Sequence, residues 1–93
     1  MPPAGERKLV VVPAFLDDLR WWASTQPRTA VRLLDLVEAV LRDPFVGIGK
    51  PEPLKRLGAN MWSRRITDEH RLVYRVFADR IELLKGRPLL ASL

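Results

Sequence analysis

The stretch MWSRRITDEHRLVYRVF, residues 61–77, decides the fold of this chain. Within residues 61–67 the side chains of Trp62, Arg64 and Ile66 alternate with those of Ser63, Arg65 and Thr67, which is the period of a β-strand. Residues 70–77 alternate in the same way, and Asp68–Glu69 predicts a tight turn between the two runs. We therefore expect an antiparallel pair of strands. Its apolar side should carry Leu72, Tyr74 and Val76, and its opposite side Ser63, Arg65, Arg71 and Arg75.

The elements around this pair complete an α+β fold. The β-branched run Lys8–Val12 predicts a short buried strand, residues 54–57 predict another short strand before a turn at residues 58–60, and residues 80–85 predict the last strand. One helix should begin at Pro13 and end near residues 24–27, and a second should run from residue 27 or 28 to Arg42, before Pro44. Their apolar stripes are Phe15, Leu16, Leu19 and Trp22, then Ala30, Leu33, Leu34, Val37, Val40 and Leu41. We expect an antiparallel β-sheet, a meander, with this two-helix hairpin packed on one face.

Composition predicts one small domain covering residues 1–93. Residues 1–7 should form a loose arm, and residues 88–93 a tail. The 16 Lys and Arg against 11 Asp and Glu give a net charge of +5, which favours nucleic acid, an acidic partner or an anionic surface. The absence of cysteine excludes disulfides and thiolate metal sites and fits the cytoplasm. No run is long and apolar enough for a membrane span, so no membrane partner is expected.

The loop Pro44–Pro53 holds the carboxylate with the clearest chemical potential. Pro51 and Pro53 flank Glu52, and Lys50 and Lys55 lie close by. Such a carboxylate can act as a general base toward a ribose 2′-hydroxyl. It can equally be a surface residue paired to Lys55. The sequence has no phosphate-binding glycine loop and too few histidines and cysteines for a zinc site, so neither a metal nor a cofactor is predicted.

The arginines of the two strands have two interpretations. Arg64, Arg65, Arg71 and Arg75 could bind RNA phosphates, or they could form a solvated sheet face. Arg71 could also pair with Glu69 or Asp68. His70 alternates with Arg71, which predicts a structural residue on the other side.

The three tryptophans have alternatives as well, since Trp21, Trp22 and Trp62 could stack on bases. Trp22 fits the core, whereas Trp21 lies off the stripe and is a candidate for a protein interface.

Two long motifs resemble one family. DPFVGIGKPEPLK, residues 43–55, and WSRRITDEHRLVY, residues 62–74, are similar to the loop and strands of the YoeB (Txe) toxins in the RelE/ParE superfamily. The resemblance covers roughly residues 12–85. It implies a microbial-RNase-like fold and a toxin of a type II toxin–antitoxin system that cleaves mRNA in the ribosomal A site. It also implies a YefM/Axe-like antitoxin as partner, and a homodimer is possible.

The same resemblance implies roles for individual residues. Glu52 matches the family's catalytic glutamate and Arg71 its catalytic arginine, while Lys55 and Arg65 match residues that contact RNA. We also expect Lys50, beside the glutamate, and Arg87, near the end of the chain, to bind RNA.

The tail departs from the family pattern. Members typically end in Ala-Arg-Tyr-His-Tyr, with the histidine as acid, but here Arg87 is followed by PLLASL, so Leu89 and Leu90 stand in the places of histidine and tyrosine. Leucine cannot donate a proton. Three explanations remain: a weakened toxin that still binds its antitoxin, a tail change that permits expression, or cleavage by arginines alone. The alternatives in function are an antitoxin-binding or co-repressor module and a free RNA-binding protein.

Overall fold

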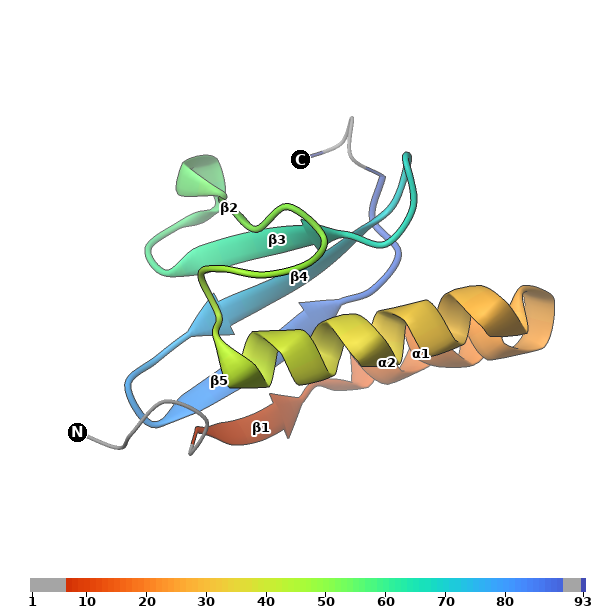
Figure 1. Cartoon of the computed structure of the whole chain (residues 1–93), viewed down its shortest axis with the longest axis horizontal. Coiled ribbons are helices and arrows are strands. Elements are labelled where there is room, and N and C mark those ends of the chain that lie inside the picture. The colour runs from red at the N-terminus through yellow and green to blue at the C-terminus, as the bar shows by residue number, and fades with distance from the viewer. Residues whose placement is uncertain (1–6, 90–92) are drawn as a thin grey trace.

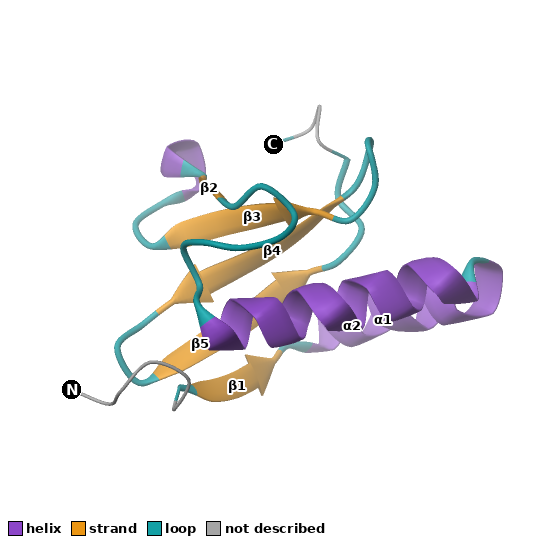
Figure 2. Ribbon diagram, in the orientation of Figure 1, coloured by secondary structure: helices purple, strands orange, loops and turns teal. Residues whose placement is uncertain are grey.

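The computed structural model describes residues 7–89 and 93. Its order is β1 (Lys8–Val11), α1 (Pro13–Thr25), α2 (Pro27–Arg42), β2 (Glu52–Pro53), a 3-10 turn (Lys55–Leu57), β3 (Met61–Arg65), β4 (Arg71–Val76) and β5 (Arg80–Lys85). The five strands form one sheet in the order β1-β5-β4-β3-β2, and the helical hairpin covers one of its faces (Figures 1 and 2). The predicted α+β fold is therefore confirmed. Within the described part of the chain, no helix is long and apolar enough to cross a membrane.

The sheet is mixed rather than antiparallel throughout. β3 pairs antiparallel with β4, and β4 with β5, as the alternation predicted. β1, however, runs parallel to β5, with Leu9 opposite Ile81. The meander prediction is wrong for this strand because the run Lys8–Val12 carries no information about its partner. The prediction that the strand is buried is also wrong, since it lies at the edge of the sheet and Leu9 and Val10 are each 38% exposed.

The core lies between the helices and the helix-facing side of the sheet. Phe15, Trp22, Leu33 and Val40 from the helices meet Leu72, Tyr74, Val76 and Leu83 from the strands. Two positions of the predicted stripes are wrong, since Leu16 and Leu34 are half exposed, and Leu36, which the stripe omitted, is fully buried. Leu72, Tyr74 and Val76 of β4 face the helices, as predicted.

The segment after the loop also differs from its prediction. The strand occupies Glu52–Pro53, and Lys55–Leu57 forms a 3-10 turn instead of the expected strand over residues 54–57. The Leu57 amide donates to the Leu54 carbonyl at 3.0 Å, so the chain curls here toward Gly58. The consequence is that Glu52 itself lies on a sheet edge, opposite Ser63 of β3.

The two ends of the chain are only partly described. Of the predicted arm, Arg7 is held by a bond from its Nε to the Phe77 carbonyl at 2.8 Å, and residues 1–6 lie outside the described part. In the predicted tail, residues 90–92 lie outside it too.

Candidate functional site

The proposed base and the proposed catalytic arginine meet at one end of the sheet. Arg71 Nη2 lies 3.3 Å from Glu52 Oε2, and Arg71 Nη1 donates to Ser63 Oγ at 2.7 Å. The Arg71 side chain is 2% exposed, whereas that of Glu52 is 51% exposed. The ion pairs that the sequence offered for these two residues are not the ones observed. Glu52 pairs with Arg71 rather than with Lys55, and Arg71 pairs with neither Glu69 nor Asp68.

Strand register explains how the three side chains come together. Glu52 is the cross-strand partner of Ser63, and Ser63 is the partner of Val73, two residues from Arg71 on β4. Side chains of paired residues lie on the same face of a sheet. The shortest strand therefore delivers an accessible carboxylate to a buried guanidinium. Such a pair can combine proton removal with stabilisation of negative charge.

The face that carries this pair is rich in cations. Arg65 lies directly opposite Arg71, and Arg75 lies opposite Met61 two residues beyond Val73. The Nε atoms of Arg65, Arg71 and Arg75 are buried and have no hydrogen-bond partner among the described residues. Each of these three guanidinium groups therefore has a donor that the described part of the chain leaves unsatisfied. The face is not fully open, because Met61, Ser63, Arg71 and Val73 are buried.

Arg64 has a different position from its neighbours. It lies on the helix-facing side, is fully buried and donates to the carbonyls of Asp43, Val46 (3.2 Å) and Ile48 (3.1 Å). Its Nε donates to the Tyr74 hydroxyl at 3.2 Å, and that hydroxyl donates to the Pro44 carbonyl at 2.7 Å. The interpretation of Arg64 as an RNA-binding arginine is therefore wrong. Arg64 organises the loop that leads to Glu52.

Burial also affects the hydroxyl in this network. Removal from water raises the pKa of Tyr74 above its ordinary value of 10.0, and the Arg64 guanidinium opposes that shift. The neutral phenol is the form that can donate to Pro44 and accept from Arg64 at once.

The remaining predicted cations lie at separate places around the site. Lys50 is exposed in the loop with φ of 51°, and it borders a groove of about 300 Å³ together with Arg65 and Arg32. Lys55 is exposed at the start of the 3-10 turn, three residues after Glu52. Both positions leave the ammonium free to reach a polyanion.

Arg87 is held by the first helix instead. Its guanidinium lies 4.2 Å from the Trp21 ring centroid and its Nε lies 3.8 Å from Asp18 Oδ1. The structure thus brings Glu52, Arg65 and Arg71 together and does not bring the Arg87 side chain to that pair. Trp21 is 39% exposed beneath this contact.

The tail and His70 form a structural cluster. His70 Nδ1 lies 2.9 Å from the Arg87 carbonyl, and its ring packs edge-on against Trp22 at 5.0 Å. Leu89 pairs with His70 in an isolated bridge, and the Arg71 amide donates to the Pro88 carbonyl at 3.1 Å. The prediction that His70 is structural and faces away from Arg71 agrees with this packing. Leu89 thus lies next to the Arg71 end of β4.

Two residues have structural roles that the sequence interpretation missed. Ser63 is fully buried and fixes the Arg71 guanidinium, and Arg64 fixes the loop. A signal for Arg64 was present, since its alternation with Trp62 and Ile66 places it on the apolar side. Ser63 had no such signal beyond its place beside Arg71 on the same face.

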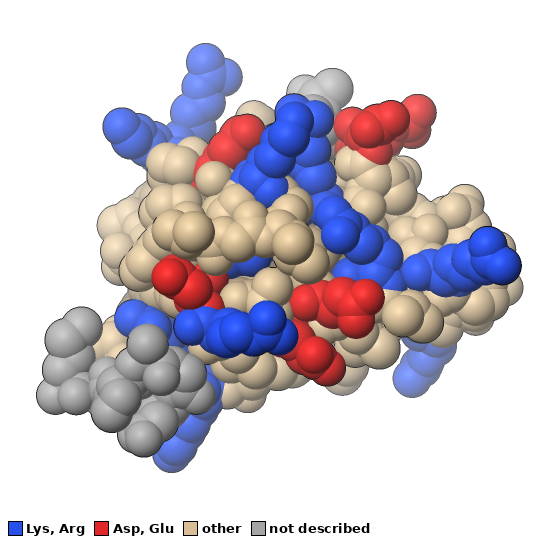
Figure 3. Space-filling view, viewed as in Figure 1, with Lys and Arg blue, Asp and Glu red and all other residues tan. Residues whose placement is uncertain are grey.

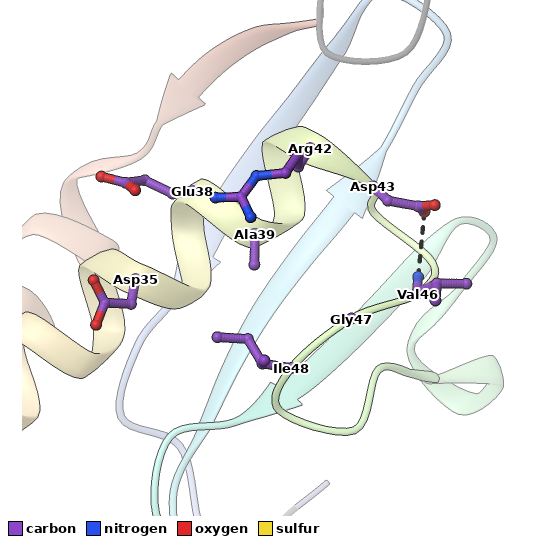
Figure 4. Close-up of a pocket in the computed structure, with 8 residues that line it drawn as sticks. All are labelled: Asp35, Glu38, Ala39, Arg42, Asp43, Val46, Gly47 and Ile48. Atoms are coloured by element: carbon purple, nitrogen blue, oxygen red, sulfur yellow. Dashed lines mark hydrogen bonds between the residues drawn. The ribbon is translucent and has the colours of Figure 1, made fainter.

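A larger cavity lies on the helix side. It measures about 430 Å³ between α2 and the loop, and Ile48 points toward α2 there while Asp43 accepts from the Val46 amide at 3.2 Å (Figure 4). Asp35, Glu38 and Arg42 line it as well. On this side of the molecule, acidic and basic side chains are interspersed (Figure 3). The cavity is separate from the Glu52–Arg71 pair and has no comparable set of free cations.

Comparison with known proteins identifies the same group of toxins as the motifs. Residues 12–88 match the family model described as the YoeB-like toxin of bacterial type II toxin–antitoxin systems. Toxin RelK of Mycobacterium tuberculosis is 48% identical over 75 residues, covering 81% of this chain and 88% of the relative. Toxin YoeB of Escherichia coli is 45% identical over 74 residues, covering 80% and 88%.

Solved structures match over most of the chain. The YoeB/ParE toxin from Agrobacterium tumefaciens superposes with a TM-score of 0.80 at 45% identity, covering 86% of this chain and 96% of that one. The YoeB dimer from Staphylococcus aureus gives 0.80 at 29% identity, covering 88% and 95%. The YoeB–YefM complex from the same organism gives 0.76 at 30% identity, covering 87% and 94%.

Proposed function

Because the chain belongs to the YoeB-like toxin family of bacterial type II toxin–antitoxin systems, we propose that it is an endoribonuclease that cuts mRNA in the ribosomal A site. The observation that carries the proposal is the Glu52–Arg71 pair, in which an exposed carboxylate adjoins a guanidinium fixed by Ser63. A base and a phosphate-binding cation side by side are what cleavage by a neighbouring 2′-hydroxyl requires.

In the proposed reaction Glu52 takes the proton from the 2′-hydroxyl. The 2′-oxygen then bonds to the adjacent phosphorus, the bond to the 5′-oxygen breaks, and a 2′,3′-cyclic phosphate remains on the upstream fragment. Arg71 releases Glu52 and turns its donors to the phosphate oxygens, where negative charge increases. Arg65, directly across from Arg71, and the free ammonium groups of Lys50 and Lys55 hold the RNA backbone.

The departing 5′-oxygen needs a proton, and this is the weak step for this chain. Leu89 stands in the family's histidine position and has no proton to give. Loss of a general acid costs about 10²–10⁴ in rate. We therefore expect slow cleavage, with the proton taken from water. The Arg87 guanidinium, at Asp18 and Trp21, would have to leave α1 to help.

The partners follow from the relatives. A YefM-like antitoxin is the expected inhibitor, since a Staphylococcus aureus relative forms a YoeB–YefM complex, and a homodimer is expected because a relative forms a dimer. The site of action is the cytoplasm, where translating ribosomes present the mRNA.

The test is primer extension on mRNA from cells that express the chain. Glu52→Gln and Arg71→Ala should each remove the cleavage products, whereas Arg28→Ala, an exposed arginine of α2, should leave them unchanged. Cleavage that persists in both site variants would show that the assigned residues do not carry the reaction.

A second function is favoured by the tail: a catalytically impaired toxin that acts as an antitoxin-binding or co-repressor module. It predicts no cleavage at any expression level but tight antitoxin binding. Replacing the residues after Arg87 with Tyr-His-Tyr distinguishes the two. A gain in cleavage of about 10²-fold or more would show that the tail limits an otherwise intact site, while no gain would favour the binding module.

A further inference from the structure

Arg75 and Lys85 extend the cationic face beyond the proposed catalytic pair. Arg75 lies opposite Met61 of β3 and Glu82 of β5, and Lys85 lies opposite Val73. Arg75 lies on the face that carries Arg71 because side chains alternate along β4. Lys85 lies there because a bulge in the β4–β5 ladder leaves it opposite Val73, and paired residues share a face. Arg75 lies four residues along β4 from Arg71, about 14 Å at the rise of an antiparallel strand.

The Arg75 guanidinium has no anion of its own among the described residues. Its Nε is buried without a hydrogen-bond partner, as in Arg65 and Arg71. Its cross-strand neighbour Glu82 instead accepts from Arg80 Nε at 3.3 Å. Buried donors without partners are rare in folded proteins, and at a cationic group they indicate a place for an anion.

The Arg75 guanidinium lies beside the turn before β3. A Cβ added to Gly58 would lie 3.8 Å from Arg75 Nη2, so the guanidinium lies beside a residue that has no side chain to cover it. Lys85 is exposed at the end of β5 and adds a second positive charge on the same face. The planar guanidinium of an arginine and the exposed ammonium of a lysine can both bind backbone phosphates.

We propose that Arg75 and Lys85 form a second phosphate subsite, which binds the mRNA backbone away from the bond that is cut. The inference rests on the proposed function, because it takes the RNA to be bound along this face. RNA is favoured over an acidic protein because the cations continue the row of Arg65 and Arg71, whose free donors have the same character. Contacts to phosphate fix the register of the strand without reading its bases.

The experiment measures binding rather than cleavage. Each protein carries Glu52→Gln to prevent turnover, and its binding to mRNA-programmed ribosomes and to a fluorescent single-stranded RNA is measured across a salt series. Arg75→Gln keeps most of the side-chain stem and should weaken binding and reduce the salt slope by about 1, because one phosphate contact is lost. Lys85→Gln should act in the same direction, and Arg75→Lys should recover part of the slope.

Arg28→Gln removes the same charge from α2 and is the matched control, which should match the parent. Melting curves establish that each variant is folded. If Arg75→Gln binds both RNA targets with the parent's salt slope, the subsite does not exist. A loss confined to antitoxin binding would overturn it as well. Failure of the proposed function can be distinguished from failure of the subsite. It would appear as cleavage of mRNA by the Glu52→Gln or Arg71→Ala protein, whereas failure of the subsite appears in RNA binding.

Discussion

Replacing Arg64 with methionine should destabilise the whole domain through the loop that carries Glu52. The guanidinium donates to three loop carbonyls, those of Asp43, Val46 and Ile48, and to the Tyr74 hydroxyl. Methionine fills a similar space but donates nothing.

The expected change in the free energy of unfolding follows from the hydrogen bonds that are lost and the desolvation cost that is removed. Hydrogen bonds to a charged group contribute about 1.5–3 kcal/mol each. The buried guanidinium itself is costly to desolvate, and methionine removes that cost. The loop residues are exposed, so their carbonyls regain water when the loop opens. We expect a net loss of about 2–4 kcal/mol in the free energy of unfolding, a large part of the stability of a domain this small.

The assay is urea unfolding followed by tryptophan fluorescence, for which the chain has three tryptophans. The midpoint should fall with little change in slope, and Arg28→Met, an exposed matched change, should stay within about 0.5 kcal/mol of the parent. Arg64→Lys should recover only part of the loss, because one ammonium cannot span three carbonyls. If Arg64→Met unfolds like the parent, the guanidinium does not hold the loop, and the account of how Glu52 is positioned fails.

Three further predictions concern the loop and the core. The raised pKa of Tyr74 means that the folded protein holds this proton more tightly, so the contribution of Tyr74 to stability should be fully present below pH 10.0 and be lost as the pH rises through the native pKa. Since Tyr74 is the only tyrosine, phenolate absorbance should appear at higher pH in native protein than in urea, and coincident curves would contradict burial as the cause. Gly49→Ala should cost about 1–3 kcal/mol in urea unfolding, because its φ is +85° and its Cβ would lie 2.7 Å from Leu36 Cδ2; an unchanged midpoint would show that the loop adjusts. Trp22→Phe should lower the melting temperature by several degrees, because its indole N–H donates to the buried Gly86 carbonyl at 2.8 Å, and equal stability would mean that water replaces the bond.

The parts of the fold that sequence could predict are those with a regular period. The alternation over residues 61–77 specified both strands and the faces of Leu72 and Arg71, and the prolines at 13, 27 and 44 marked helix boundaries. Pairing partners have no such signature, which is why the parallel β1–β5 contact was missed. A helical stripe also does not define which residues lie at its edge. The prediction therefore placed Leu34 in the core and omitted Leu36, although Leu36 is the buried residue of the two.

The site was predictable to a similar degree. A carboxylate between two prolines and arginines at alternate positions indicated Glu52 and Arg71, but their contact depends on β2 being a two-residue edge strand. Charge misled the interpretation of Arg64, because an arginine was expected at the surface and the loop's need for donors was not visible in the sequence. The periodicity had placed it correctly on the apolar side.

The strand order has a consequence for how this toxin is made. β5 is encoded last of the strands, yet it lies inside the sheet, between β1 and β4. Until residues 80–85 have left the ribosome, β1 has no partner and the helical hairpin lacks the strand against which α1 packs. Contacts that join the two ends of a chain also form slowly. A nascent chain therefore cannot complete its sheet until its last strand has been synthesised, however early the other strands emerge.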